Sequence, residues 1–360
     1  MKKKGKSEKR EFLGAFPSLL HRAFTFPTSD HRVIRFLLRL LLWPLLLLSL
    51  AFAGTAAWTS GRLLFPTRRA MQNYHQEILS QPARYGLHIE RYTGPQGTPC
   101  LLITPSPNPG AARKSRLLRE LLAKSGVIPP PWGKIRGTLV LLHGYQGRKE
   151  DNLPVAERFC AAGFRCLIPD LPGHGDHPAA TATFGKNEVG LVNALLDDAA
   201  RRFRFAPKPA GLFGISQGGA IALQTAAQSG DRWQAVASVA AFASLDQPVH
   251  QAALRLSPEL DRISPFTETA CASGVYCRAG FTPAGVRPVD DARHLRIPAF
   301  IAHGEDDRFI PPASGQAIFD AIPHERKTFR FVKGADHHDV LAVGSNALYA
   351  ELCAFFLRSL

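Results

Sequence analysis

The sequence contains no C-x-x-C pair, although it has six cysteines. Structural zinc sites commonly use that spacing, so nothing in the sequence supports such a site. Cys271 and Cys277 lie six residues apart in CASGVYC, a polar segment that resembles a turn, and could close a small disulfide loop in an oxidising compartment. Cys160 and Cys166 have the same spacing, but Cys166 falls in an apolar strand pattern that suits a buried free thiol equally well. The cysteines fit an exported protein without requiring one.

Acidic residues are scarce, with 29 Asp and Glu against 44 Lys and Arg, and the formal net charge is +15. The excess is uneven, because residues 1–39 hold ten basic and three acidic side chains. The other basic residues are scattered and are not interleaved with aromatic side chains as they are along nucleic-acid grooves. We therefore expect no nucleic-acid partner, and interpret residues 1–39 as a basic cytoplasmic head.

Residues 40–58, LLLWPLLLLSLAFAGTAAW, contain no charged side chain. Nineteen such residues are about enough to cross a bilayer as a helix, and a membrane helix tolerates Pro44 near its start. Ten basic residues precede this span, whereas the 22 residues after it contain only three arginines. The positive-inside rule then places the N-terminus in the cytoplasm and the rest of the chain outside it, in the periplasm if the cell is bacterial.

Two alternatives to a retained membrane anchor stay open. The tetrapeptide AFAG, residues 51–54, offers an A-x-A cleavage site, so that the segment would be a signal peptide and the protein secreted. Its basic region would be much longer than in ordinary signal peptides. A buried core helix is the second alternative, although an uncharged run of this length is unusual for one.

The rest of the chain has the pattern of an α/β protein. Residues 85–92 and 99–105 predict two short strands around a turn. Apolar strands then alternate with helices, which predicts βαβ units, a mostly parallel sheet and helices on both faces. Only residues 246–296, rich in Pro, Ser, Thr and charge, break the alternation and indicate an insertion. The expected strands are 137–144, 164–170, 210–216, 233–243, 297–304 and 327–334, and the expected domains are a linker at 59–83 and an α/β domain at 84–360.

The motif G-x-S-x-G occurs once after an apolar strand, in GLFGISQGG, residues 211–219. It places Ser216 between Gly214 and Gly218, and a Gly/Ala-rich helix follows. A nucleophile at a strand-to-helix elbow has a strained backbone, so its neighbours must be small enough for strand and helix to approach. Ser216 is therefore a candidate nucleophile, with an ordinary serine in a turn as the alternative.

The strand 137–144 ends in His143-Gly144 and leads into an open loop. That loop can direct the backbone N–H of Tyr145 toward the nucleophile. Together with the N–H of Gln217, it would form an oxyanion hole, in which two dipoles point to where charge develops during acyl transfer. A simple glycine-containing loop between a strand and a helix would have the same residues.

Two later strand ends offer a carboxylate and a base. Asp307, in HGEDDRFIPP, is positioned to accept an imidazole N–H and fix its tautomer, with Glu305 and Asp306 as competitors. His337 and His338 follow the last strand, where a histidine can reach over the sheet to deprotonate a serine. A solvent-exposed acidic loop and a structural histidine are the alternatives.

The order nucleophile, acid, histidine resembles the α/β-hydrolase superfamily. The resemblance covers residues 84–360 and depends on HGYQG, PDLPGHG, GISQGG, HGEDDRFIP and GADHHDV occurring in this order. It implies that Ser216 is the nucleophile and that Asp307, at the fifth position of H-G-x-x-D, is the acid. His337 is the implied base because it lies three residues after Gly334, although Asp336 stands where a glycine is usual.

Within the superfamily, the chain is similar to membrane-anchored serine hydrolases with a small cap, here residues 246–296. The acetyl-xylan and cephalosporin deacetylases are also similar, but DLPGHG lacks their Arg-Gly-Gln stretch. The expected activity is hydrolysis of a carboxylic ester or thioester of a small-molecule or lipid-like substrate, without metal or organic cofactor. A serine peptidase, an acyltransferase and a catalytically inactive membrane-tethered binding protein are the alternatives.

Overall fold

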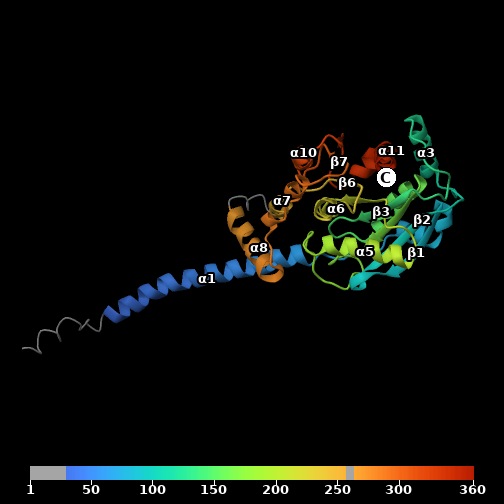
Figure 1. The fold of residues 1–360 in the computed structure, drawn as a ribbon. Coiled ribbons are helices and arrows are strands. Elements are labelled where there is room, and N and C mark those ends of the chain that lie inside the picture. Colours follow the sequence, from blue (N-terminus) through green and yellow to red (C-terminus); the bar gives the residue numbers. More distant parts are fainter. Residues whose placement is uncertain (1–29, 257–262) are drawn as a thin grey trace, which may run out of the picture. The chain divides into compact units, whose positions relative to one another are not determined.

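The computed structural model describes residues 30–256 and 263–360 (Figure 1). Most of the predicted basic head therefore lies outside the described residues. The chain divides into two compact units, and the boundary falls between Phe52 and Ala53.

The helix α1 (Asp30–Leu64) begins in the first unit, and its large apolar side chains from Val33 to Leu50 are exposed. Two of the described helices are long and apolar enough to cross a membrane, Val33–Leu64 in α1 and Val340–Ser359. Exposed apolar surface of this extent is unusual in water and is what a bilayer covers. The N-terminal helix thus has the properties of a signal anchor or a membrane span.

The second unit is built on an eight-stranded sheet with the order β1-β2-β4-β3-β5-β6-β7-β8. The β1–β2 and β2–β4 pairs are antiparallel, and all other neighbours are parallel. Each strand lies within or close to a predicted segment, because the strands are apolar runs bounded by Gly, Pro or polar residues. The strands are β1 (Leu87–Thr93), β2 (Pro99–Pro105), β3 (Gly137–Leu142), β4 (Phe164–Pro169), β5 (Ala210–Ile215), β6 (Ala235–Val239), β7 (Ala299–Gly304) and β8 (Lys327–Val332).

Helices cover both faces of the sheet, as predicted. Successive residues of a strand point to opposite faces, so Leu139 and Leu141 of β3 join one hydrophobic core, and Val140 and Leu142 join the other. The first core is completed by α3 (Arg113–Lys124), α4 (Leu153–Ala161) and α11 (Val340–Ser359). The second is completed by α5 (Glu188–Arg202), α6 (Gln217–Gln228), α9 (Pro288–Ala292) and α10 (Pro312–Ala321).

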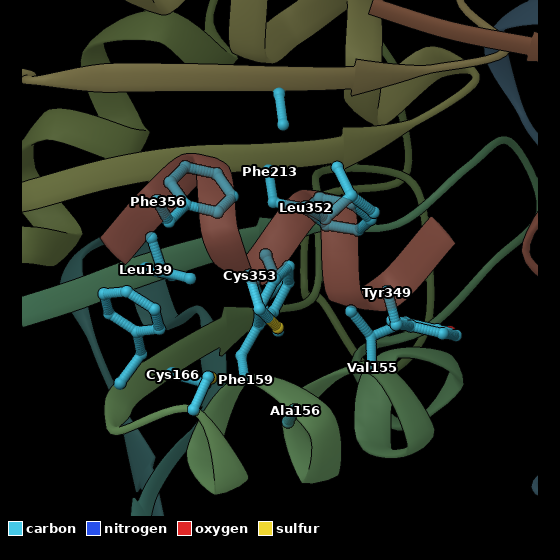
Figure 2. Packing of buried hydrophobic residues seen from close by; sticks show 14 of the residues in the cluster. Leu139, Val155, Ala156, Phe159, Cys166, Phe213, Tyr349, Leu352, Cys353 and Phe356 are labelled. Carbon is cyan, nitrogen blue, oxygen red and sulfur yellow. The ribbon is translucent and has the colours of Figure 1, made fainter. Parts of the chain in front are cut away.

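Figure 2 shows how α11 packs in the first core. Phe159 of α4 contacts Phe213 of β5 and Phe356 of α11 edge-on, with ring centroids 5.2 and 5.6 Å apart. Leu352 and Cys353 of α11 are fully buried beside them. The apolar character of α11 is therefore explained by its place in the core.

Two segments contain helices that were not predicted from the sequence. The stretch 59–83, expected as a linker, holds the end of α1 and the helix α2 (Asn73–Ser80). Residues 246–296 contain α7 (Asp246–Leu256), α8 (Ser264–Ala279) and α9. The short 3-10 helices are η1 (Pro82–Tyr85), η2 (Pro95–Gly97), η3 (Lys149–Asn152) and η5 (Pro283–Gly285).

The interpretation of CASGVYC as a turn was wrong, because the whole segment lies in α8. Cys271 and Cys277 are both free thiols, as are Cys160 and Cys166. Gly274 serves helix packing, since a Cβ on it would overlap the carbonyl of Ala56 in α1. A pattern of Gly, Ser and Ala therefore marks a close helix–helix contact here instead of a turn.

Candidate active site

Ser216 lies at the sharp connection between β5 and α6. Its backbone has φ 53° and ψ −117°, a conformation that non-glycine residues rarely adopt. A Cβ on Gly214 would overlap the carbonyl of Gly218, and a Cβ on Gly218 would overlap the carbonyl of Leu142. Neither position has room for a side chain, so the two glycines allow the strand and the helix to meet at the serine.

The three residues predicted as nucleophile, acid and base lie together at the carboxyl edge of the sheet. Nε2 of His337 is 3.0 Å from Oγ of Ser216, and Nδ1 of His337 is 2.8 Å from Oδ2 of Asp307. Ser216 follows β5, Asp307 follows β7 and His337 follows β8. Since these strands are parallel, their ends meet at one edge and bring residues 121 positions apart into hydrogen-bond contact.

The carboxylate of Asp307 is buried and fully used as an acceptor. Oδ1 accepts the N–H groups of Phe309 (2.9 Å) and Ile310 (2.7 Å), and Oδ2 is also 3.3 Å from Nε2 of His303. Burial by itself would raise the pKa of Asp307, but hydrogen bonds from His303, His337 and Ile310 hold that pKa well below its usual value. The side chain is therefore ionised at neutral pH.

His303 was not singled out from the sequence, although it begins the HGEDD motif. Its ring is completely buried, and Nε2 lies 2.9 Å from the carbonyl of Ile310 as well as close to Asp307. It thus supports the loop that shapes the Asp307 site. A histidine that opens a motif carrying a candidate acid was the only signal available for it.

The competing candidates are outside the hydrogen-bonded group. Glu305 and Asp306 are exposed. His338 is also exposed, and its ring contacts the His337 ring edge-on at 5.2 Å. Asp336 has a structural role, because its Oδ1 accepts hydrogen bonds from the N–H groups of Arg308 (3.0 Å) and His337 (2.7 Å).

Asp336, at the position where a glycine was expected, therefore links two loops. Arg308 belongs to the loop of the candidate acid, and His337 is the candidate base, so one carboxylate holds both loops in register. These two hydrogen bonds lower the pKa of Asp336. The departure from the usual pattern is compensated by a new contact between the two loops.

The loop after β3 lies beside Ser216. A Cβ on Gly144 would be 3.5 Å from the Ser216 Cβ. His143 is buried, accepts the N–H of Leu171 at Nε2 (3.0 Å) and has Nδ1 2.9 Å from the Gly144 carbonyl. Burial lowers the pKa of His143 to about 4, so the ring is neutral at pH 7 and braces the loop.

Gln217 is the first residue of α6, so its N–H has no acceptor within the helix and lies at the positive end of the helix dipole. Its side-chain amide is buried and has no hydrogen-bond partner among the described residues. The hydroxyl of Tyr145 donates to the carbonyls of Leu63 (3.2 Å) and Arg62 at the end of α1. The loop predicted to supply an oxyanion donor is thus tied to α1.

A cavity of about 290 Å³ opens beside Ser216 and Gln217. Most of its lining side chains are apolar, and they come from the end of α1, from α7 and α8, and from the loops after β3, β4, β6 and β7. Arg62 and Glu268 are the charged side chains among them. The site combines a hydrogen-bonded serine, a histidine, an ionised carboxylate and an apolar recess.

Comparison with known proteins agrees with this fold. Residues 133–271 match the family model described as serine aminopeptidase, S33. The fold is similar to that of an esterase, Pf2001 of Pyrococcus furiosus, with a TM-score of 0.58 and 14% identity over 83% of this chain and 98% of the esterase. The chain has the α/β-hydrolase fold.

Two further solved structures of similar fold are named for different activities. A putative lipase, lip1 of Acinetobacter baumannii, has a TM-score of 0.53 and 15% identity over 81% of this chain and 98% of the lipase. The acylaminoacyl peptidase of Pyrococcus horikoshii has a TM-score of 0.52 and 13% identity over 81% of this chain and 44% of the peptidase. None of the curated proteins compared with this chain matches it. At these identities the likeness concerns the fold, so the reaction has to be argued from the site.

Proposed function

We propose that the protein is a serine hydrolase that cleaves a carboxylic ester or thioester through an acyl-enzyme on Ser216. The observation that supports this most directly is the continuous hydrogen-bonded chain from Ser216 through His337 to the ionised Asp307. The strained backbone at Ser216 and the exclusion of side chains around it are further support.

In the first half-reaction, Oγ of Ser216 attacks the carbonyl carbon of the substrate while Nε2 of His337 accepts the hydroxyl proton. Asp307 holds the Nδ1–H tautomer and stabilises the imidazolium that forms. The N–H groups of Gln217 and Tyr145 are proposed to bind the oxyanion. Collapse of the tetrahedral intermediate breaks the bond to the leaving alcohol or thiol, which takes the proton from His337.

In the second half-reaction, water attacks the acyl-enzyme. His337 takes one proton from that water, and the same oxyanion donors stabilise the second tetrahedral intermediate. Release of the acid returns the proton to Ser216 and restores the resting site. No step needs a group outside the chain other than substrate and water.

A serine peptidase is the second candidate, because the matching family model is described as a serine aminopeptidase. The same three residues would serve it, and so would transfer of the acyl group to an alcohol. The mostly apolar lining of the cavity favours an acyl chain over a charged peptide terminus. Rates with p-nitrophenyl esters of graded chain length, compared with aminoacyl p-nitroanilides, separate the candidates, and an added alcohol acceptor tests transfer.

We also propose that α1 is a retained anchor with the N-terminus in the cytoplasm and the hydrolase domain outside it. Its exposed apolar surface and the basic residues before it support this placement. Mass spectrometry of the mature N-terminus tests retention, and labelling of intact against permeabilised cells with a membrane-impermeant probe tests sidedness.

The central test of the proposed reaction is labelling with a fluorophosphonate. The parent protein should be labelled and a Ser216→Ala protein should not be, while both should unfold at similar urea concentrations. Equal labelling of the two proteins would show that Ser216 is not the nucleophile.

A further inference from the structure

One wall of the cavity beside Ser216 is formed by the last turns of α1. Thr55, Trp58, Thr59 and Leu63 all line the cavity. Their spacing of three and four residues places them on one face of the helix. The rest of the lining comes from α7, from α8 and from mostly apolar side chains of the sheet loops. The recess next to the nucleophile is therefore shaped by the end of the N-terminal helix.

Close packing holds this wall in the second unit. Gly274 of α8 has no room for a Cβ because the Ala56 carbonyl and the Ser60 side chain of α1 lie against it. Arg278 of α8 donates to the carbonyl of Ala57 at 2.9 Å. The hydroxyl of Tyr145 donates to backbone carbonyls at the C-terminal end of α1. The end of α1 is thus a fixed part of the site and not a flexible connection.

The same helix has the properties of a membrane span, and its interfacial residues lie at the cavity. The apolar segment runs from Val33 to Leu64. Trp58 is half exposed, and the Arg62 guanidinium lies 5.5 Å from its ring centroid. Trp and Arg at the end of an apolar helix are typical of the membrane–water interface. From Trp58 to Leu63 the helix rises only about 8 Å, so the cavity begins at the level of the interface.

We infer that the substrate is an acyl ester of a membrane-resident lipid, and that its acyl chain lies in the cavity against the end of α1. This inference rests on the proposed hydrolase function and names its substrate class. The apolar lining suits a hydrocarbon chain, and the buried, unpartnered amide of Gln217 offers hydrogen bonds to the ester beside Ser216. A lipid held at the interface reaches this cavity along α1 without its chain crossing water.

The test uses the full chain reconstituted in phosphatidylcholine vesicles. Two probes are compared, p-nitrophenyl palmitate in the same bilayer and p-nitrophenyl acetate in the water. Thr59→Phe places a larger side chain on the α1 wall and so narrows the cavity. Thr55→Phe does the same one helical turn closer to the N-terminus. Ala53→Phe is the matched control, because Ala53 is exposed and does not line the cavity.

The wild-type protein should cleave both probes. Thr59→Phe and Thr55→Phe should lower kcat/KM for p-nitrophenyl palmitate about tenfold or more. They should change kcat/KM for p-nitrophenyl acetate by less than about twofold. Ala53→Phe should change neither value. Labelling by a short-chain fluorophosphonate identifies any variant that has lost its fold, and the other variant then decides. Unchanged palmitate cleavage in a folded cavity variant would overturn the inference.

Whether the substrate's acyl chain comes from the membrane is tested with the wild-type protein alone. Palmitate ester in the protein's own vesicles should be cleaved about tenfold faster than the same amount in separate, protein-free vesicles, since a long chain exchanges slowly through water. Equal rates would overturn a membrane source. Cleavage of the acetate without the palmitate would refute the lipid inference and leave the hydrolase proposal standing. Cleavage of neither, with no probe labelling, would refute the hydrolase proposal itself.

Discussion

Replacing Asp307 by asparagine tests the proposed mechanism at the atom that fixes the histidine tautomer. Asparagine keeps the size of the side chain but has one acceptor oxygen and one NH₂ group. The N–H groups of Phe309 and Ile310 both point at Oδ1, so they hold the asparagine oxygen on their side. The NH₂ group then replaces Oδ2 and faces Nδ1 of His337, 2.8 Å away in the native protein.

The consequence is a histidine with its proton on the wrong nitrogen. Nδ1 of His337 must accept from the asparagine, so Nε2 carries the proton and donates to Ser216 instead of accepting from it. Loss of the correct tautomer in a serine–histidine–acid triad lowers kcat by about 10⁴, which corresponds to about 5 kcal/mol of transition-state stabilisation. The fold should persist because both backbone hydrogen bonds to the side chain are kept.

The assay is the initial rate of p-nitrophenyl butyrate hydrolysis, with urea unfolding to compare stability. Asp306→Asn is the matched control, since Asp306 is adjacent, exposed and outside the hydrogen-bonded chain. Its rate should equal that of the parent protein. If Asp307→Asn retained a tenth of the parental kcat or more, or if Asp306→Asn were the damaging change, Asp307 would not be the orienting acid.

Three further changes follow from the contacts around the site. Asp336→Ala removes the carboxylate that accepts hydrogen bonds from the N–H groups of Arg308 and His337, and it should lower kcat about tenfold because His337 is displaced. Asp336→Asn keeps an acceptor oxygen and should restore most of the rate. Equal rates for the two variants would contradict this role of Asp336. Tyr145→Phe leaves two carbonyls at the end of α1 without their donor and should lower the free energy of unfolding in urea by about 1 kcal/mol, against no change if that contact is unimportant. His143 has a folded-state pKa of about 4 against 6.5 unfolded, so the unfolded chain binds the extra proton between these values. The free energy of unfolding should therefore fall by about 3 kcal/mol as pH drops from 6.5 to 4, and His143→Gln should have a shallower pH dependence.

The sheet could be predicted from the sequence because its strands are apolar runs with clear ends. The elbow at Ser216 was predictable for the same reason, since a strand, a G-x-S-x-G motif and a helix follow one another locally. The choice of Asp307 over its acidic neighbours came from the family resemblance, and burial explains it, because Asp307 alone of the three is enclosed. The role of Asp336 in linking two loops was not predictable, since its hydrogen-bond partners lie on two separate loops.

The helices of the cap could not be predicted because they are not marked by their own residues. The Gly, Ser and Ala of α8 are weak signals for a helix in isolation, and they become favourable only where a second helix approaches closely. That second helix is α1, and the hydrogen bond from Arg278 to Ala57 joins residues 221 positions apart. A contact between such distant residues cannot be predicted from the local hydrophobic periodicity of the sequence.

The sequence by itself determined the parallel sheet, the strained serine between two glycines and the long apolar N-terminal segment, because each depends on residues that are close together in the chain. Only the tertiary structure decided that His337 contacts Ser216 and that the end of α1 is a wall of the cavity. Both depend on where the sheet edge and the cap bring distant segments together, and that placement is set by the packing of the whole domain.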